Sequence, residues 1–164
     1  MAIACEKSVQ KAMEGWHAAP ANPLVGTWRL ISCTARRRNG RLIPLYGPEP
    51  EGRLFYDAAG NMSVQIMRPG RRCFRAAQRS RATDDELRAA YQGYEAYFSS
   101  YEVDEARRLI RHHVRGGLFP NWTGSVQERY YRFDGPDRLI LSTGPQDAQP
   151  GGRAVVTLVW ERIG

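Results

Sequence analysis

Residues 53–67 of the chain read RLFYDAAGNMSVQIM, which is the pattern of two short strands joined by a turn. The turn falls at residues 57–60, because Asp and Gly favour the backbone conformations that reverse a chain. In the second strand, Met62, Val64 and Ile66 are spaced two residues apart and therefore share one face. The stretch predicts a β-hairpin with one apolar face.

Further short strands are predicted on both sides of this hairpin. They are expected at residues 24–36, 41–44, 99–104, 109–115, 124–133, 138–143 and 154–163. In the first of them, Trp28, Leu30 and Ser32 should share one face, and Asn39-Gly40 after it predicts a two-residue turn with positive φ at both positions. About eight or nine strands at a spacing of roughly 8–12 residues indicate an all-β sandwich or closed barrel.

One helix is predicted between the strands, with Thr83 as its N-cap. The apolar residues after this cap follow at helical spacing and are Leu87, Ala90, Tyr91, Tyr94 and Phe98. Before the helix, residues 68–81 are rich in arginine and lack a regular pattern, which predicts a mobile flap. Residues 1–19 are expected to form a short amphipathic helix or a loose tail. The chain is thereby divided into an N-terminal segment, 1–23, and a β-domain, 24–164.

The composition of the 164 residues is typical of a globular domain, with 42% hydrophobic and 25% charged residues. The apolar runs are too short to cross a bilayer, and the first residues lack the apolar segment of a secretion signal, so a cytoplasmic protein is expected. Cys5, Cys33 and Cys73 are widely spaced without a CxxC pair. Free thiols are therefore expected, and neither disulfides nor a zinc site.

Lys and Arg number 24 against 17 Asp and Glu, which gives a net charge of +7. No nucleic-acid-binding motif accompanies the arginines, so a basic surface on a protein with another role is the better explanation. The patterns GxSxG, GxGxxG after a strand, HExxH and the P-loop do not occur. Hydrolase, kinase and dehydrogenase activities therefore lose their usual support.

His112 is the first candidate functional residue. Ile110, His112 and Val114 share the apolar face of their strand, so His112 is expected to point inward. His113 must point the opposite way, so the two histidines cannot ligate one metal in the interior, and no metal or cofactor site is predicted. An inward histidine is either a core residue with satisfied hydrogen bonds or a group that transfers a proton or orients a ligand.

In residues 124–133, one face carries Gln127, Arg129, Tyr131 and Phe133, and the other face mixes polar and apolar residues as well. The alternation does not settle which face is inside. If the first set is inside, Gln127 and Arg129 lie beside His112 and could hold a carbonyl or enolate oxygen. If it is outside, the same residues form a row of solvated charge. Tyr101, on the strand before His112, could add a phenol.

The loop at 118–122, LFPNW, is too apolar for an ordinary surface loop. It is expected to line or close one mouth of a barrel, with Phe119 and Trp122 as apolar contacts and the Asn121 amide as a hydrogen-bonding group for a ligand. The alternative is a hydrophobic plug that seals the barrel.

Together these segments resemble the lipocalin-like domain proteins of bacteria and fungi, over residues 24–163. The landmarks are LVGTWRL (24–30), PEPEG (48–52), GNMSVQ (60–65), YFSSYEVD (97–104), HHV (112–114), LFPNW (118–122), QERY (127–130) and VWER (159–162). The resemblance implies an up-and-down antiparallel barrel of about eight strands that can hold one small ligand. It also implies that Trp28 closes the barrel floor under Arg162.

The resemblance implies binding of a small, mostly apolar molecule, and some similar proteins of natural-product pathways look like cyclases, isomerases or dehydratases without a cofactor. The first hypothesis is such an enzyme for a polyketide-like or terpenoid-like compound, with His112 as acid or base and Tyr101 and Arg129 polarising oxygens. Residues expected to contact the ligand are Asn121, Trp122, Gln127, Phe119, Tyr131, Met62 and Val64.

The second hypothesis is a carrier protein that uses the same cavity without turnover. The third is a basic interaction protein whose barrel is filled by side chains such as Tyr56, Tyr131 and Phe133. The oligomeric state is left open, a homo-oligomer included.

Overall fold

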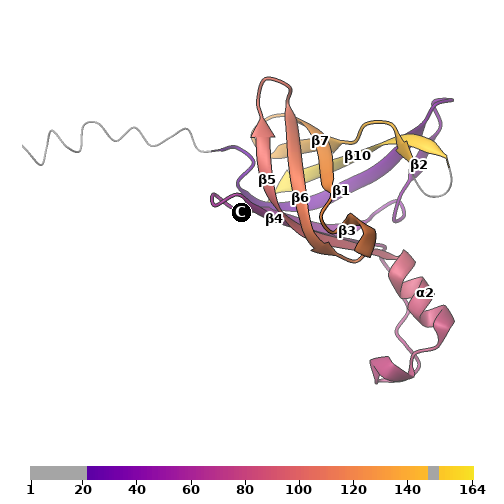
Figure 1. Ribbon diagram of the computed structural model, residues 1–164. Helices are drawn as coiled ribbons and strands as arrows, with labels where there is room; N and C mark the ends of the chain where they lie inside the picture. The colour runs from indigo at the N-terminus through magenta and orange to yellow at the C-terminus, as the bar shows by residue number, and fades with distance from the viewer. Residues whose placement is uncertain (1–21, 148–151) are drawn as a thin grey trace, which may run out of the picture.

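The computed structural model describes residues 22–147 and 152–164, and these form a closed antiparallel barrel of eight strands (Figure 1). The strands are β1 (Gly26–Arg37), β3 (Glu51–Tyr56), β4 (Asn61–Met67), β5 (Tyr94–Asp104), β6 (Leu109–Gly117), β7 (Val126–Phe133), β8 (Arg138–Ser142) and β10 (Arg153–Arg162). Each pairs with the next, and β10 pairs with β1 to close the barrel. The up-and-down barrel is confirmed, and the sandwich is excluded. The helix expected at 1–19 lies outside the described residues.

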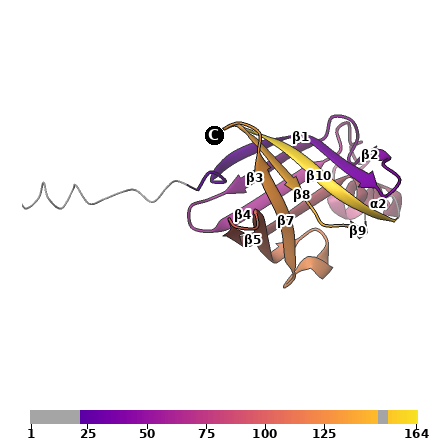
Figure 2. The same ribbon diagram turned by 90° about the horizontal axis from the view of Figure 1, so that it is seen from above.

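The short elements lie around this barrel. They are β2 (Leu42–Pro44), α2 (Asp84–Gln92), β9 (Gln146–Asp147) and the 3-10 turns η1 (Arg79–Arg81) and η2 (Pro120–Trp122). β2 extends the edge of β1, and β9 pairs with the start of β10. Seen from above, β1 and β10 run side by side (Figure 2). No helix within the described ranges combines the length and the apolar character needed to span a membrane.

The core lies inside the barrel, where alternate residues of each strand meet. Met62, Val64 and Ile66 are buried there, as predicted. β1 departs from simple alternation because its pairing with β10 shifts between Leu30 and Ser32. This bulge moves Cys33 and Ala35 into the core, so the predicted placement of Ser32 on the face of Trp28 and Leu30 is wrong.

The floor of the barrel is formed by Trp28 and Arg162, as the resemblance implies. Trp28 is completely buried, and the guanidinium carbon of Arg162 lies 4.1 Å from its ring centre. Arg162 also donates hydrogen bonds to the carbonyls of Pro23 and Val25, at 2.6 and 2.9 Å. Gly26 has φ +142°, and a Cβ atom there would lie 2.5 Å from Nη1 of Arg162. Glycine is therefore required at this position.

The turn after β1 differs from the predicted one. Only Gly40 has a positive φ, of 82°, whereas Asn39 is not in the left-handed region. Gly40 N donates to Arg37 O, and Arg37 N donates to Arg41 O. This is a longer loop with glycine in the left-handed position, in which Asn39 Oδ1 accepts from Arg41 N.

The predicted helix forms, but it is shorter than its apolar spacing suggests. Thr83 and Glu86 make a reciprocal capping box, and α2 ends at Gln92. Tyr94 and Phe98 belong to β5, because Tyr94 pairs with Met67 on β4 and extends the sheet. Their assignment to the helix is wrong. Hydrogen bonding to β4 places them in the sheet, although their spacing in the sequence also fits a helix.

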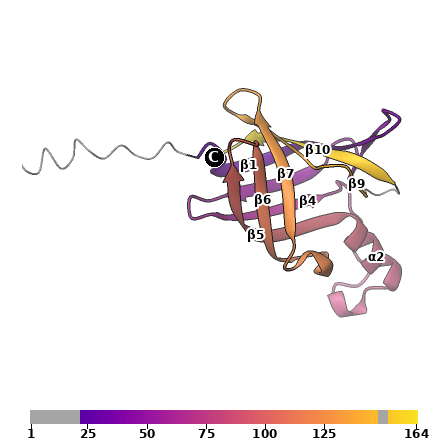
Figure 3. The same cartoon turned by 45° about the horizontal axis from the view of Figure 1, so that its top comes forward.

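Residues 68–82 and α2 project away from the end of the barrel (Figures 1 and 3). Arg68 N donates to Gly93 O at 2.9 Å, so the two ends of this excursion lie together. Arg71 lies over the Tyr94 ring at 5.2 Å and donates to Ala90 O. The arginine-rich segment therefore packs on α2, and its role as a flap stays a prediction.

Candidate ligand-binding site

His112 lies inside the barrel on β6, with 1% of its surface exposed. The Tyr56 hydroxyl on β3 lies 2.8 Å from its Nε2, and the Tyr97 hydroxyl on β5 lies 3.0 Å from its Nδ1. A neutral imidazole has one N–H and one acceptor nitrogen, so one tyrosine donates to the ring and the other accepts from it. Both ring nitrogens of His112 are therefore satisfied by phenols.

Burial keeps these three side chains uncharged near neutral pH. The pKa of His112 is lowered well below 6.5, mainly by burial and further by the positive charge of Arg129. Burial raises the pKa of both Tyr56 and Tyr97. The group can hold and relay a proton along hydrogen bonds, but it carries no net charge itself.

Arg129 is the buried cation of this site. β7 turns Gln127, Arg129, Tyr131 and Phe133 inward, which settles the face that alternation left open. Arg129 is 8% exposed, and its Nη1 donates to the carbonyl of Glu128 at 2.8 Å. Within the described residues, no carboxylate oxygen lies within 4.0 Å of its guanidinium.

The barrel wall is open beside Arg129. β7 pairs with β6 from Val126 to Tyr130, but it pairs with β8 only from Tyr130 to Phe133. Beyond Ser142 the chain follows β10 instead, through β9. Residues 126–129 therefore have a strand partner on one edge only.

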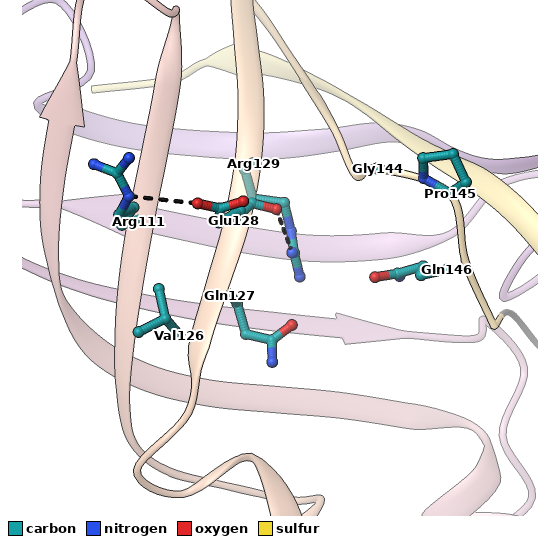
Figure 4. A pocket seen from close by; sticks show the side chains of 8 residues that line it. All are labelled: Arg111, Val126, Gln127, Glu128, Arg129, Gly144, Pro145 and Gln146. Atoms are coloured by element: carbon teal, nitrogen blue, oxygen red, sulfur yellow. Dashed lines mark hydrogen bonds and ion pairs between the residues drawn. The ribbon is translucent and has the colours of Figure 1, made fainter.

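A cavity of about 520 Å³ occupies this opening. Its lining residues are Arg111, Val126, Gln127, Glu128, Arg129, Gly144, Pro145 and Gln146. Figure 4 shows Arg129, Gln127 and Gln146 extending into the space between β7 and the segment 144–146. Arg111 stays on the outer side, where it is paired with Glu128 at 3.4 Å and Asp104 at 3.7 Å. The volume lies in the range of small-molecule sites, about 300–1,000 Å³.

Tyr101 neighbours His112 in the sheet but makes its hydroxyl contacts elsewhere. Its backbone is opposite His112 in the sheet, as expected. Its hydroxyl, however, donates to Asp57 O at 2.8 Å and accepts from Asn22 Nδ2 at 3.2 Å. The phenol of Tyr101 therefore fastens the β3–β4 turn, and its predicted action on a ligand oxygen stays a prediction.

The loop at 118–122 covers one side of the interior. Trp122 is half-buried and packs edge-on against Tyr97, with ring centres 5.6 Å apart. Phe119 packs in the same way on Trp122 at 5.9 Å and stays partly exposed. Asn121 is exposed. The loop packs against Tyr97, and contact of Phe119, Asn121 and Trp122 with a ligand stays a prediction.

The other predicted contact residues are split between two environments. Gln127 is directly opposite His112 in the sheet and lines the cavity, and its Nε2 donates to Ser125 Oγ at 3.1 Å. Met62 and Val64 are buried in the core, and Tyr131 is half-buried against it. The structure thus brings Gln127 and Arg129 together at the cavity and keeps Met62, Val64 and Tyr131 in the packed interior. Their contact with a ligand stays a prediction.

Sequence reasoning missed Tyr97 as a partner of His112 and considered Tyr56 only as a filling residue. Tyr97, Ser99 and Tyr101 alternate on the buried face of β5, and this alternation could have indicated Tyr97. The predicted helix extended to Phe98 and therefore included Tyr97. Tyr56 reaches His112 from a strand that is not its neighbour, and no local pattern reports such a contact.

Metal ligands do not gather in the part of the chain that the structure describes. No group of three or more His, Cys, Asp or Glu side chains there could hold a metal ion. His113 points away from His112, and its Nε2 lies 3.4 Å from Glu102 on the outer face.

A closed up-and-down barrel of eight strands, with a tryptophan floor under an arginine and polar groups inside, defines a lipocalin-like protein. The chain belongs to the lipocalin-like domain family, whose model matches residues 25–163. The resemblance drawn from the sequence landmarks is thereby confirmed.

Similar proteins include a curated relative and two designed barrels. The chain is 36% identical over 88 residues to the 4'-hydroxy-3'-methoxypropiophenone carrier protein ppsC of Aspergillus oryzae, which is 50% of this chain and 78% of that protein. A redesigned β-barrel matches with a TM-score of 0.42 and 11% identity over 88% of this chain and 95% of that one. A de novo fluorescence-activating β-barrel matches with a TM-score of 0.40 and 12% identity, over 87% of this chain and 96% of that one.

Proposed function

We propose that this chain binds and carries a small, largely apolar molecule that bears a carbonyl or phenol oxygen. The observation that carries this proposal is the buried guanidinium of Arg129, which has no carboxylate within 4.0 Å in the described chain and borders a cavity of about 520 Å³. The name of the Aspergillus oryzae relative supports it, because that protein is called a carrier of an aromatic ketone with a phenol group.

The cavity combines the two kinds of surface that such a ligand needs. Val126 and Pro145 supply apolar surface, and Gln127 and Arg129 supply donors that fix orientation. Burial of apolar ligand surface contributes roughly 25 cal/mol per Å², and the polar groups add specificity. A cofactor has no part in this function.

A second candidate function is catalysis, as a cofactor-independent cyclase, isomerase or dehydratase of a natural-product intermediate. The observation that favours it is the hydrogen-bonded series Tyr56–His112–Tyr97, which could relay a proton to a substrate oxygen. Both nitrogens of His112 are occupied, so a tyrosine hydroxyl would have to make the substrate contact. We place carriage first because His112 has no free nitrogen to act directly as a base.

The setting of this function is also part of the proposal. We place the protein in the cytoplasm, where Cys33 and Cys73 stay free thiols as they are in the structure. The functional domain is residues 24–164, preceded by the segment 1–23. Membranes and nucleic acids are not its partners in this proposal, and a homo-oligomer stays open.

Native mass spectrometry of the full chain with 4'-hydroxy-3'-methoxypropiophenone, and with extracts of the producing organism, tests the proposal. A compound that is retained unchanged supports the carrier, whereas one that is released with water loss or an isomerised structure supports the enzyme. Arg129→Gln should weaken retention, and Arg132→Gln, at an exposed outward position on the same strand, should not. Retention of no small molecule by the native protein contradicts both functions.

A further inference from the structure

Arg129 is a buried cation, and no carboxylate oxygen of the described residues lies within 4.0 Å of its guanidinium. Its guanidinium has five N–H donors, and the carbonyl of Glu128 accepts from one of them. Leaving an uncompensated cation in a protein interior costs several kcal/mol, so buried charges are normally paired. The arrangement therefore has room for an anion that residues 22–147 and 152–164 do not place beside it.

The titratable groups around Arg129 come from four strands, and none of those described forms an ion pair with it within 4.0 Å. Cys33 on β1, Tyr56 on β3, Tyr97 and Glu95 on β5, and His112 on β6 all feel its charge. Burial raises the pKa of Cys33 to about 12, and it also raises the pKa values of Tyr56, Tyr97 and Glu95. It lowers the pKa of His112. At Cys33, at both tyrosines and at Glu95, the positive charge of Arg129 opposes this effect of burial and lowers the pKa.

The free edge of β7 places this charge where a ligand can reach it. Tyr131 N donates to Arg108 O next to β6, so by strand alternation the carbonyl of Glu128 points to the other, unpaired edge. Arg129 Nη1 is bound to that carbonyl and is therefore held at the opening in the wall. Figure 4 shows its side chain extending toward the cavity, beside Gln127.

We propose that Arg129 is an anion site, and that this cavity takes its ligand as an ionised acidic oxygen, a phenolate, enolate or carboxylate attached to an apolar body. The inference rests on the proposed function and specifies the ligand class of that same site. A guanidinium at short range stabilises such an anion by a charge-assisted hydrogen bond. An acidic phenol bound here releases its proton to the buffer, and its ionisation midpoint falls by about 1–3 pH units.

A pair of probes tests this inference: 4-hydroxypropiophenone, whose phenolate absorbs at longer wavelength than the phenol, and its methyl ether, which cannot ionise. Both are titrated against the full chain, and the bound phenol's absorption is followed against pH. The expected result is the phenolate spectrum in the complex at a pH where the free probe is neutral, with the phenol binding at least about tenfold more tightly than the ether.

Variants at Arg129 decide whether this residue is the cause. Arg129→Gln should return the bound midpoint to that of the free phenol and bring the two probes to similar affinity. Arg129→Lys, which keeps the charge, should retain part of the shift, and Arg132→Gln on the outer face of the same strand should retain all of it. Circular dichroism and the melting temperature of each variant report on folding.

Three results would overturn the inference. Binding of the neutral phenol by the native protein, with an affinity equal to that of the ether, leaves the proposed carrier intact but removes the anion site. A shift that survives in a folded Arg129→Gln variant assigns the anion to another group and has the same effect. Failure of both probes to bind contradicts the anion site and the proposed function together.

Discussion

The hydroxyl of Tyr56 lies 2.8 Å from Nε2 of His112, although the two residues are 56 positions apart in the chain. With Tyr97 on the other ring nitrogen, the imidazole joins β3, β5 and β6 across the inside of the barrel. This contact fixes the histidine and consumes the atoms that would otherwise meet a ligand directly. The stability and the pH response of the protein should both depend on it.

Replacing Tyr56 by Phe should lower the free energy of unfolding by about 1–3 kcal/mol, because one ring nitrogen of His112 then stays buried without a partner. Urea unfolding measures the change. Tyr91→Phe, on the exposed side of α2, is the control and should leave stability within about 0.5 kcal/mol. A double variant with His112→Phe should recover part of the loss, and simple additivity of the two changes would contradict the hydrogen bond.

His112→Phe should weaken ligand binding, or abolish turnover if the protein is an enzyme, without unfolding the barrel. The ring is buried in an aromatic setting that includes Tyr56 and Tyr97, so phenylalanine preserves most of the packing. Ligand titration and circular dichroism measure the two effects. Unchanged binding and turnover in a folded variant would rule out a functional role for His112.

Stability should fall as the pH drops below about 6.5, because the folded protein lowers the pKa of His112 well below that ordinary value. Between the two pKa values the unfolded chain binds the extra proton, so the free energy of unfolding decreases by up to about 1.4 kcal/mol per pH unit. The stabilisation is complete above pH 6.5 and is lost progressively below it. Urea unfolding from pH 7.5 to 5 should show this slope. His112→Phe removes one titrating group, so the free energy of unfolding of that variant should depend less steeply on pH.

Arg162→Gln should lower stability by about 1–3 kcal/mol, because it removes the contact with the Trp28 ring and the hydrogen bonds to Pro23 and Val25. Thermal unfolding is the measurement, with Arg132→Gln on the exposed face of β7 as the matched control. Equal melting temperatures of the two variants would show that the arginine does not hold the floor.

Deletion within residues 70–81 should change ligand exchange rates more than the melting temperature. These residues are exposed or half-buried, and Arg68 and Gly93 already meet at the base of the excursion. A short Gly-Ser linker in place of 70–81 can therefore be tolerated by the barrel. Stopped-flow binding and thermal unfolding compare the two effects. A large loss of stability would make the segment part of the folded core, and unchanged exchange rates would remove its role as a flap.

The sequence by itself determined those features that depend on neighbouring residues. The alternation at Met62, Val64 and Ile66 placed one face of β4 in the core, and the alternation around His112 turned it inward. Thr83 with Glu86 determined where the helix begins. The order of the landmarks also identified the family and, with it, the Trp28–Arg162 floor. Each of these signals lies within a few residues or in a motif, so it can be read along the chain.

Only the tertiary structure decided how these strands combine into a site. The inward face of β7, and with it the burial of Arg129, follows from the register of β7 with β6 and β8, which no local pattern contains. Tyr56 and Tyr97 meet at His112 because the barrel brings three strands around one ring. The cavity exists because β8 leaves β7 at Ser142. Alternation of side chains gives each strand two faces. Pairing between strands that are distant in the sequence decides which face is buried and which residues it contacts.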